Sequence, residues 1–487
     1  MISTYQLLEF AAQSWPDSPA IIDKGGAVSY SELYAQTEVL KAELLRLGLL
    51  KGQGLGVMAR NGSAFVAMMF AGMGCGAVVL PISHQLKAAE IDALMNDTQL
   101  HAVLDDQSGV QPVDTDVEMI TYAQQTLRFA SLERLENKPL TPLNDAAFIR
   151  YTSGTTGRSK GVVLTHQSIL QRVAVTQKAL NLIADDAVLW VLPMAFHFLV
   201  TILVYIRAGT RIIVCKDLLA HTIIQDANQH HATMLYAAPM HFRLLAADLS
   251  AEQMPTLQSA ISTSAAIPLN IAEKFAKRFN LPVTQAYGII ELGLPLLDST
   301  PDNAKNPQSV GFPISEFSIE LLNADNEPVA EKEVGRLAIR GPGMFDAYLK
   351  PWQTREQVMD NGWFMTGDLA QREADGRIVV CGREKTMINV SGNKAFPEEI
   401  EAVLNKHTAI VAAHVYGQQH PLMGEIVCAE VVLVENAELD VEAILRFCRA
   451  QLSAYKIPQR LKQVAQIAHT QSGKIIRVKA SQVSMNA

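Results

Sequence analysis

The chain has 487 residues, of which 49% are hydrophobic and 18% are charged. A chain of this length and composition can bury a large core and exceeds one ordinary domain, so we expect a folded protein of at least two domains. Its formal net charge of -8 argues against a nucleic-acid-binding protein, which would need a basic face.

The five cysteines are scattered and form no CxxC pair. This spacing disfavours a zinc site or a disulfide framework and fits a reducing, cytoplasmic environment. Residues 1–13 lack a basic segment followed by an apolar run, so no signal peptide is expected. Two uncharged runs, 63–82 and 187–206, have the length of a membrane span. Glycines or Pro193 and His197 interrupt them, and we expect buried strands and helices instead, because buried parallel strands read as continuous apolar runs.

The predicted elements begin with a helix over 5–15. The stretch 28–33 then predicts a strand that ends at a helix with Ser31 as its N-cap. Strand-like runs recur further along, with helix-like segments between most of them, at 55–58, 78–80, 102–104, 148–151, 188–192, 211–214 and 234–237. Strands that alternate with helices predict an α/β fold with parallel sheets flanked by helices.

The sequence changes in character after about residue 310. Shorter β-like runs at 317–322 and 336–340 predict a small β subdomain, and a small α+β segment follows Gly382-Arg383.

The most specific motif follows the predicted strand at 148–151. It reads Tyr-Thr-Ser-Gly-Thr-Thr-Gly-Arg-Ser-Lys-Gly over 151–161. Glycines allow the backbone to approach an anion, and the hydroxyls and the lysine add donors for phosphate oxygens. A flexible polar turn would have a similar composition, and the spacing is not that of a Walker A loop, because two residues separate Gly157 from Lys160.

Further motifs follow in chain order, and each alone is typical of a turn. They are Ser-Ala-Ala-Ile-Pro-Leu at 264–269, Gln-Ala-Tyr-Gly-Ile-Ile-Glu at 285–291, Gly-Trp-Phe-Met-Thr-Gly-Asp at 362–368, Gly-Arg-Glu-Lys at 382–385 and Thr-Gln-Ser-Gly-Lys-Ile-Ile-Arg at 470–477. Together with the loop, they resemble the signatures of the adenylate-forming superfamily: acyl- and aryl-CoA synthetases, firefly luciferase and the adenylation domains of non-ribosomal peptide synthetases. The resemblance extends over about 5–479.

The resemblance implies a site for ATP and Mg²⁺. The ATP-binding residues would be Thr152, Ser153, Gly154, Thr155, Thr156, Gly157, Lys160, Ala265, Ala266, Tyr287, Gly288, Asp368 and Arg383. Tyr287 would stack on adenine, and Asp368 would accept hydrogen bonds from the ribose hydroxyls. Glu291, with Thr156, would hold Mg²⁺, and Lys474 would be the catalytic lysine. Ile290 stands where the family has threonine, which removes a hydroxyl near the α-phosphate.

The resemblance also implies two domains. The larger one, 1–384, would contain parallel-rich sheets and the small β subdomain, and residues 385–487 would form a small, mobile α+β lid. Lys385 would be the hinge, and the loop at Gly392 would meet the thiol acceptor after the lid rotates.

The acid is expected to bind near His197, Phe198 and Ile289. His197 stands where adenylation domains for α-amino acids carry the aspartate that pairs with the substrate ammonium, so an α-amino acid is disfavoured. His197 can equally be a core histidine. Apolar neighbours favour a fatty or aryl acid; they are Phe196, Phe198, Leu199, Val200, Ile289 and Ile290.

The sequence therefore predicts an acid–thiol ligase that makes an acyl-adenylate and passes the acyl group to coenzyme A. Three alternatives stay open: the phosphopantetheine of an acyl carrier protein as acceptor, luciferase-like chemistry without thiol transfer, and a non-catalytic sensor of acyl or nucleotide ligands. Either coenzyme A or a carrier protein would bind to basic surface residues, so the basic candidates do not distinguish these two acceptors. The candidates are Arg158, Lys394, Lys456 and Arg460.

Overall fold

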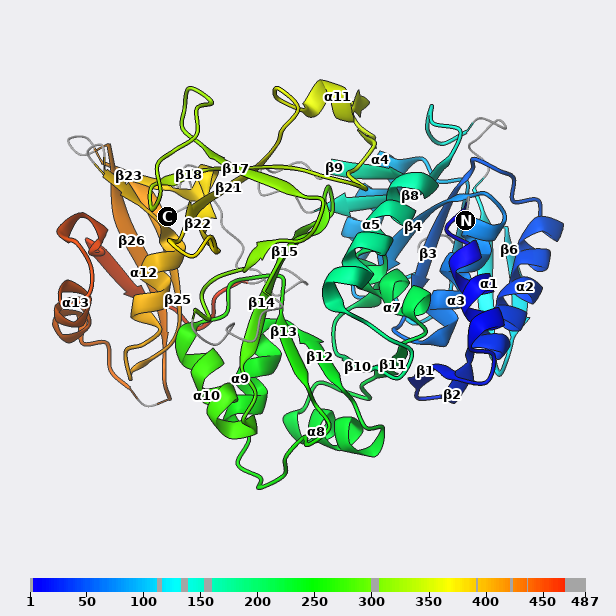
Figure 1. Cartoon of the computed structure of the whole chain (residues 1–487), viewed down its shortest axis with the longest axis horizontal. Coiled ribbons are helices and arrows are strands. Elements are labelled where there is room, and N and C mark those ends of the chain that lie inside the picture. Colours follow the sequence, from blue (N-terminus) through cyan, green and yellow to red (C-terminus); the bar gives the residue numbers. More distant parts are fainter. Residues whose placement is uncertain are drawn as a thin grey trace.

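A computed structural model of the chain describes residues 3–111, 116–132, 139–152, 160–298, 306–390, 393–420, 424–435 and 437–468 (Figure 1). Within these ranges the chain forms two large sheets, a smaller sheet and a C-terminal sheet with its own helices. The predicted α/β class, with a large N-terminal part and a small C-terminal part, is confirmed.

The first large sheet has nine described strands in the order β16-β15-β14-β13-β12-β10-β11-β1-β2. Its core from β14 to β1 is parallel. The strands are β1 (Pro19–Asp23), β2 (Gly26–Ser29), β10 (Ala187–Trp190), β11 (Arg211–Val214), β12 (Met234–Ala237), β13 (Ser259–Ser262), β14 (Val283–Ile289), β15 (Gly293–Leu297) and β16 (Phe312–Pro313).

The second large sheet also has nine described strands, in the order β20-β19-β9-β8-β4-β3-β5-β7-β6. The strands are β3 (Gly54–Ala59), β4 (Val78–Ser83), β5 (Ala102–Asp105), β6 (Val117–Tyr122), β7 (Gln125–Ser131), β8 (Ala146–Thr152), β9 (Lys160–Thr165), β19 (Ala347–Tyr348) and β20 (Gln353–Thr354). β4 pairs in parallel with β3 and β8, and β8 with β9 antiparallel.

Helices cover and separate these sheets. They are α1 (Gln6–Ser14), α2 (Tyr30–Arg46), α3 (Ser63–Gly74), α4 (Ala88–Thr98), α5 (His166–Leu180), α6 (Met194–His197), a π-helical turn (Phe198–Ile202), α7 (Leu203–Ala208), α8 (Ala220–Gln229), α9 (Pro239–Ala247), α10 (Leu269–Phe279) and α11 (Arg355–Val358). α5 contacts β15 of the first sheet and both β8 and β9 of the second, so it lies between the two sheets (Figure 1).

The smaller sheet has the order β17-β18-β21-β22 and is antiparallel. Its strands are β17 (Ser318–Leu322), β18 (Val334–Arg340), β21 (Phe364–Arg372) and β22 (Ile378–Arg383). A 3-10 turn, Glu384–Thr386, then leads to the C-terminal elements, which are β23 (Ile388–Val390), β24 (Asn393–Ala395), α12 (Pro397–Leu404), β25 (Ile410–His420), β26 (Gly424–Leu433), α13 (Val441–Arg449), a second 3-10 turn (Ala454–Lys456) and β27 (Arg460–Gln463). These elements have a separate apolar core.

The helix after β2 begins two residues earlier than predicted. Its N-cap is Ser29, whose hydroxyl accepts from the Glu32 N–H while the Glu32 carboxylate accepts from the Ser29 N–H. Ser31 lies inside the helix and donates to the Pro16 carbonyl instead. The prediction of Ser31 as the cap was wrong, because only Ser29 has a glutamate three residues later to complete a capping box.

The two long apolar runs are interior elements, as predicted. Residues 63–82 form α3 and β4, and residues 187–206 form β10, α6, the π-helical turn and most of α7. Most of their side chains lie in the main core. Among the described residues, no helix combines the length and hydrophobicity that crossing a bilayer requires.

Candidate active site

Tyr287, Asp368 and Arg383 meet although they come from three strands of two sheets. The Tyr287 phenol, on β14, donates to Oδ2 of Asp368 on β21 at 2.5 Å. Nε of Arg383, on β22, lies 2.8 Å from Oδ1 of the same carboxylate, and its Nη1 donates to the Thr366 carbonyl at 3.1 Å. Burial and the Asp368 charge raise the pKa of Tyr287. Asp368 is only 4% exposed, so the trio places an aromatic ring beside a buried, oriented carboxylate.

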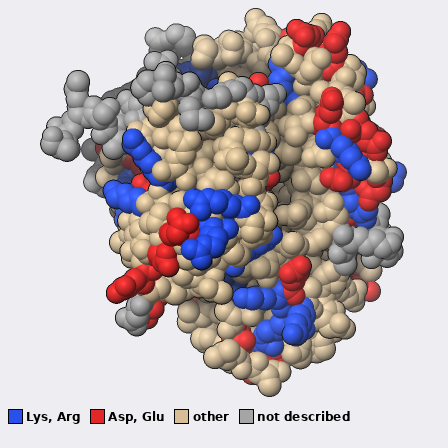
Figure 2. Space-filling model, turned by 90° about the vertical axis from the view of Figure 1, so that its left-hand side faces the viewer, with Lys and Arg blue, Asp and Glu red and all other residues tan. Residues whose placement is uncertain are grey.

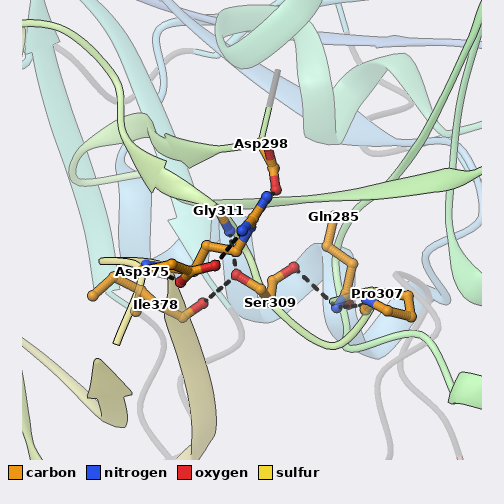
Figure 3. Close-up of polar contacts among 8 residues, drawn as sticks. Gln285, Asp298, Pro307, Ser309, Gly311, Asp375 and Ile378 are labelled. Atoms are coloured by element: carbon orange, nitrogen blue, oxygen red, sulfur yellow. Dashed lines mark hydrogen bonds and ion pairs between the residues drawn. The ribbon is translucent and has the colours of Figure 1, made fainter. Parts of the chain in front are cut away.

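A buried polar network holds β14 against β22 (Figure 3). The Gln285 amide, on β14, donates to the Pro307 carbonyl at 2.9 Å, and the Ser309 hydroxyl donates to the Ile378 carbonyl on β22 at 2.9 Å. Gly311 donates to that serine hydroxyl at 2.8 Å. A Cβ at Gly311 would lie 2.2 Å from the Asp298 nitrogen, so the close approach requires glycine.

An ion pair completes this network. Nε of Arg377, beside Ile378, lies 2.9 Å from Asp298 at the end of β15, and both side chains are buried. A second guanidinium nitrogen of Arg377 bonds the Asp375 carboxylate. The network (Figure 3) runs from Gln285 through Ser309 to Ile378, and it therefore ties β14, which also carries Tyr287, to β22, which also carries Arg383.

Glu291 follows β14, and its carboxylate is oriented by a tyrosine from the other large sheet. The Tyr348 phenol, on β19, donates to Oε1 of Glu291 at 3.0 Å. Burial and the Glu291 charge raise the pKa of Tyr348. Nζ of Lys160, the first residue of β9, lies 4.3 Å from the centre of the Tyr348 ring. Lys160 and Glu291, both predicted site residues, therefore meet around Tyr348, which the sequence did not single out.

Arg172 on α5 fixes the backbone of the same segment. Its guanidinium donates to the carbonyls of Ile290 at 2.9 Å and Gly343 at 2.6 Å. The Phe345 N–H donates to the Glu291 carbonyl at 2.7 Å. Burial lowers the pKa of Arg172 to about 10. No sequence signal marked Arg172, since an arginine on an amphipathic helix normally faces solvent.

Glu291 is the candidate magnesium ligand, and its surroundings suit an ion that binds together with substrate phosphates. No group of three His, Cys, Asp or Glu side chains within the described ranges could hold an ion by itself. Glu291 is half-buried and offers one oriented carboxylate. Mg²⁺ is usually held by one or two carboxylates plus substrate phosphates and water, so this donor set suits it.

The predicted phosphate loop lies mostly outside the described residues. The predicted loop residues outside the described ranges are Ser153, Gly154, Thr155, Thr156 and Gly157. The strands that bracket the loop are described: Thr152 at the end of β8 pairs with Lys160 at the start of β9. The loop thus begins and ends on adjacent antiparallel strands of the second sheet, and its Lys160 end lies beside Tyr348 and Glu291.

The small-residue segment follows β13. Ala265 and Ala266 are exposed, and the next residue, Ile267, is buried and donates its N–H to the Gln285 side chain at 2.9 Å. Gly288 lies where the pairing of β14 with β15 is irregular, and a Cβ there would lie 2.6 Å from the Gly293 carbonyl oxygen. Gly288 is therefore the neighbour of Tyr287 on β14, and the small-residue segment is linked to the same strand through Gln285.

The predicted hinge lies between two sheets. Lys385 is exposed in the 3-10 turn that connects β22 of the smaller sheet to β23 of the C-terminal sheet. A guanidinium nitrogen of Arg243, on α9, donates to the Val411 carbonyl on β25 at 3.0 Å and links the two parts. Gly392 and Lys474 lie outside the described residues.

The three residues expected to bind the acid, His197, Phe198 and Ile289, lie in different surroundings. The His197 ring, at the end of α6, is half-buried, with its centre 5.6 Å from that of Trp190 and 6.2 Å from that of Tyr236. Ile289, at the end of β14, is also half-buried. Phe198 is 1% exposed and packs against three other phenylalanines in the core, Phe65, Phe70 and Phe148.

Arg150 holds α6 in place. Its guanidinium donates to the Ala195 carbonyl at 2.9 Å and lies 4.4 Å from the centre of the Phe196 ring. Burial lowers the pKa of Arg150 to about 9. Because Arg150 is on β8, it connects the strand before the phosphate loop to the helix that ends at His197.

Comparison with known proteins finds family models that match most of the chain. The model of the AMP-binding enzyme family matches residues 8–349, and that of the AMP-binding enzyme C-terminal domain matches 399–474. The chain is 29% identical to a sulfoacetate–CoA ligase from Cupriavidus necator, over 97% of this chain and 96% of the relative. It is 27% identical to a feruloyl-CoA synthase from Amycolatopsis sp, over 96% of each.

Solved structures share the fold. An o-succinylbenzoate CoA synthetase from Bacillus subtilis, in complex with an acyl-adenylate intermediate, has a TM-score of 0.85 at 23% identity, over 99% of this chain and 98% of that one. An ATP-bound MatB from Rhodopseudomonas palustris has a TM-score of 0.83 at 22% identity, over 97% of both chains.

Proposed function

Since this chain belongs to the AMP-binding enzyme family, we propose that it is an AMP-forming acid–thiol ligase that activates a carboxylic acid with ATP and transfers the acyl group to coenzyme A. The observation that supports it best is the Tyr287–Asp368–Arg383 trio. A buried carboxylate can accept from two ribose hydroxyls, and the adjacent ring offers a face to adenine. The matching relatives include ligases that use CoA.

In the first half-reaction, an oxygen of the substrate carboxylate attacks the α-phosphorus of ATP. The bond between that phosphorus and the bridging oxygen breaks, and pyrophosphate leaves with its electron pair. Lys160 and the loop before it would contact phosphate oxygens. The contacts of Tyr348 with Lys160 and with Glu291 support this role. Glu291 and Thr156 would hold Mg²⁺, which when bound neutralises charge on the phosphate oxygens.

In the second half-reaction, the thiol gives up its proton and its sulfur attacks the acyl carbon. The bond from that carbon to the phosphate oxygen breaks, and AMP leaves. Residues 385–487 would rotate about Lys385 between the half-reactions, so that Lys474 withdraws and the loop at Gly392 approaches. The exposed position of Lys385 between two sheets supports this hinge.

Lys474→Ala tests the proposed division of labour. A lysine that bridges the carboxylate and the α-phosphate acts in adenylation alone, so the variant should lose acid-dependent pyrophosphate release while it still forms thioester from supplied acyl-adenylate. Equal loss of both half-reactions would contradict this role.

The acceptor is assigned to coenzyme A because the relatives named above are CoA ligases or synthases. The C-terminal surface itself favours neither acceptor. Lys456 is paired with Glu399 at 2.7 Å, and Arg460 donates to Gln418 at 2.9 Å. On the face that Figure 2 shows, Lys and Arg side chains are interspersed with Asp and Glu.

The experiment is acid-dependent pyrophosphate release across fatty, aryl and amino acids, repeated with CoA and with holo carrier protein. The proposal predicts release with at least one non-amino acid, and thioester and AMP when CoA is added. Absence of release with every acid would support a non-catalytic binding protein. Thioester with carrier protein but not with CoA would reassign the acceptor, and free acyl-adenylate with neither would indicate chemistry without thiol transfer.

A further inference from the structure

The two large sheets meet at Glu291. This candidate magnesium ligand lies between β14 and β15 of the first sheet, whereas the phenol that bonds it, Tyr348, lies on β19 of the second. Lys160 begins β9, contacts the ring of the same tyrosine, and belongs to the strand that pairs with β19. The carboxylate and the end of the phosphate loop therefore keep their relative position only if the two sheets keep theirs.

Arg172 on α5 bonds to both sides of this junction, and its side chain is buried. On the first-sheet side, Nη1 donates to the Ile290 carbonyl, directly before Glu291, at 2.9 Å. On the other side, Nε and Nη2 donate to the Gly343 carbonyl, in the segment that leads to β19, at 2.8 and 2.6 Å. The planar guanidinium fixes the directions of these bonds, which the single ammonium of a lysine cannot reproduce.

Further contacts hold α5 against the segment 343–348. The Asp346 carboxylate accepts from the Thr165 N–H at 2.7 Å and from the Ser168 hydroxyl at 2.9 Å, at the start of the helix. Because β9 runs directly into α5, the strand that ends the phosphate loop belongs to the same unit. Arg172 extends the link from this unit across to the first sheet.

The bonding of Arg172 differs from that of a structural ion pair. Within the described part of the chain, its hydrogen bonds all go to main-chain carbonyls, and Asp346 and Glu291 act on it through their charge. Burying a guanidinium without a hydrogen-bonded carboxylate opposes folding, so stability alone gives no reason for an arginine here. The fixed geometry between the carbonyls of Ile290 and Gly343 does.

We propose that Arg172 is a positioning residue for adenylation, which fixes the Glu291 carboxylate relative to the phosphate loop so that Mg²⁺ and the phosphates of ATP bind between them. The inference rests on the proposed function and adds to it a residue that acts through Glu291. Loss of Arg172 should weaken the binding of ATP together with Mg²⁺. It should spare thioester formation, because the acyl-adenylate no longer carries the β- and γ-phosphates.

Isothermal titration with ATP, in Mg²⁺ and in EDTA, tests this by binding alone. Arg172→Met should bind ATP about tenfold or more weakly in Mg²⁺, the usual effect of losing a partner behind a metal-binding carboxylate, and as the wild type does in EDTA. Arg172→Lys keeps the charge but not the fork, so it should recover only part of the affinity. Unchanged affinity in Mg²⁺, an equal loss in Mg²⁺ and EDTA, or full recovery with lysine would overturn the inference.

The two half-reactions separate this role from a structural one. For Arg172→Met, the Mg²⁺ concentration that gives half-maximal pyrophosphate release should rise about tenfold or more, while thioester formation from supplied acyl-adenylate should keep its wild-type kcat. Arg336→Met is the matched control, because it removes a guanidinium on β18 that also donates to a main-chain carbonyl, that of Asn323, at 3.1 Å. It should leave both measurements unchanged.

A different pattern would refute the inference. Equal loss of both half-reactions in Arg172→Met, with a lower melting temperature, would show that Arg172 has a structural role only. Absence of pyrophosphate release by the wild type with every acid would refute the proposed function instead.

Discussion

The Tyr287 phenol donates to Oδ2 of Asp368 at 2.5 Å, although 81 positions separate the two residues in the chain. With Arg383 on Oδ1, both oxygens of the carboxylate are engaged and its orientation is fixed. A carboxylate accepts hydrogen bonds with both oxygens, which is the chemistry that binding of ribose hydroxyls requires. The account of nucleotide binding depends on this pre-oriented carboxylate.

Asp368→Asn should weaken ATP binding by about 10- to 100-fold, because hydrogen bonds to a charged group contribute about 1.5–3 kcal/mol and the amide loses the charge that orients Arg383. Isothermal titration with ATP measures this directly. Asp248→Asn is the control, since it also alters a carboxylate bonded to an arginine, Arg278 at 2.8 Å, but lies outside the site and its supporting network. Equal affinity of Asp368→Asn and the wild type would contradict the assignment.

Tyr348→Phe should weaken the apparent Mg²⁺ affinity about tenfold, because partners that orient a metal-binding carboxylate commonly contribute that much. The readouts are the Mg²⁺ dependence of pyrophosphate release and the extra rise in melting temperature that Mg²⁺ gives to the ATP complex. Tyr122→Phe, which removes a phenol bonded to Gln36, should change neither. A lower kcat at saturating Mg²⁺ with unchanged Mg²⁺ dependence would show that Tyr348 does not act through the metal ligand.

Phe198→Ala should destabilise the protein by about 3–5 kcal/mol, the usual effect of removing a buried phenylalanine, because Phe198 fills a cluster of aromatic rings. Denaturant unfolding gives the change. The neighbouring Phe196 is half-buried, and Phe196→Ala should cost less. A shift in acid preference for Phe198→Ala with little loss of stability would return this residue to the substrate pocket.

Stability should fall as the pH is lowered from about 7.5 to 5. Nδ1 of His166 accepts from the Thr4 N–H at 3.0 Å, and burial lowers the pKa of this imidazole. The unfolded chain therefore takes up the proton first, so stability is fully present above the usual histidine pKa of about 6.5 and is lost below it. Burial also lowers the pKa of His84 and His241.

Thermal unfolding of His166→Gln should show a shallower pH dependence than the wild type, and a parallel pH dependence would contradict this assignment. The exposed His231→Gln should match the wild type.

The alternation of strands and helices predicted the α/β frame. The resemblance carried by the ordered motifs implied one nucleotide site for Tyr287, Asp368 and Arg383, which the structure brings together. The sequence also contained the signal for the Ser29 cap, a glutamate three residues later, although Ser31 was preferred. Phe198 could not be placed from sequence, since an apolar residue after a strand has the same appearance in a pocket and in a core.

Tyr348 and Arg172 were missed for a different reason. Their roles arise from contacts between β19, α5 and the segment after β14, which are distant along the chain. Neither residue has a local pattern that separates it from an ordinary core tyrosine or surface arginine.

The central claim is that a carboxylate oxygen of the acid becomes bonded to the α-phosphorus of ATP. It is tested most directly with an acid whose carboxylate is labelled with oxygen-18, turned over with ATP and CoA and analysed by mass spectrometry of the nucleotide. The account predicts AMP that carries one heavy oxygen, because the thiol cleaves the bond between the acyl carbon and oxygen. ADP as the product, or AMP without the label, would contradict it.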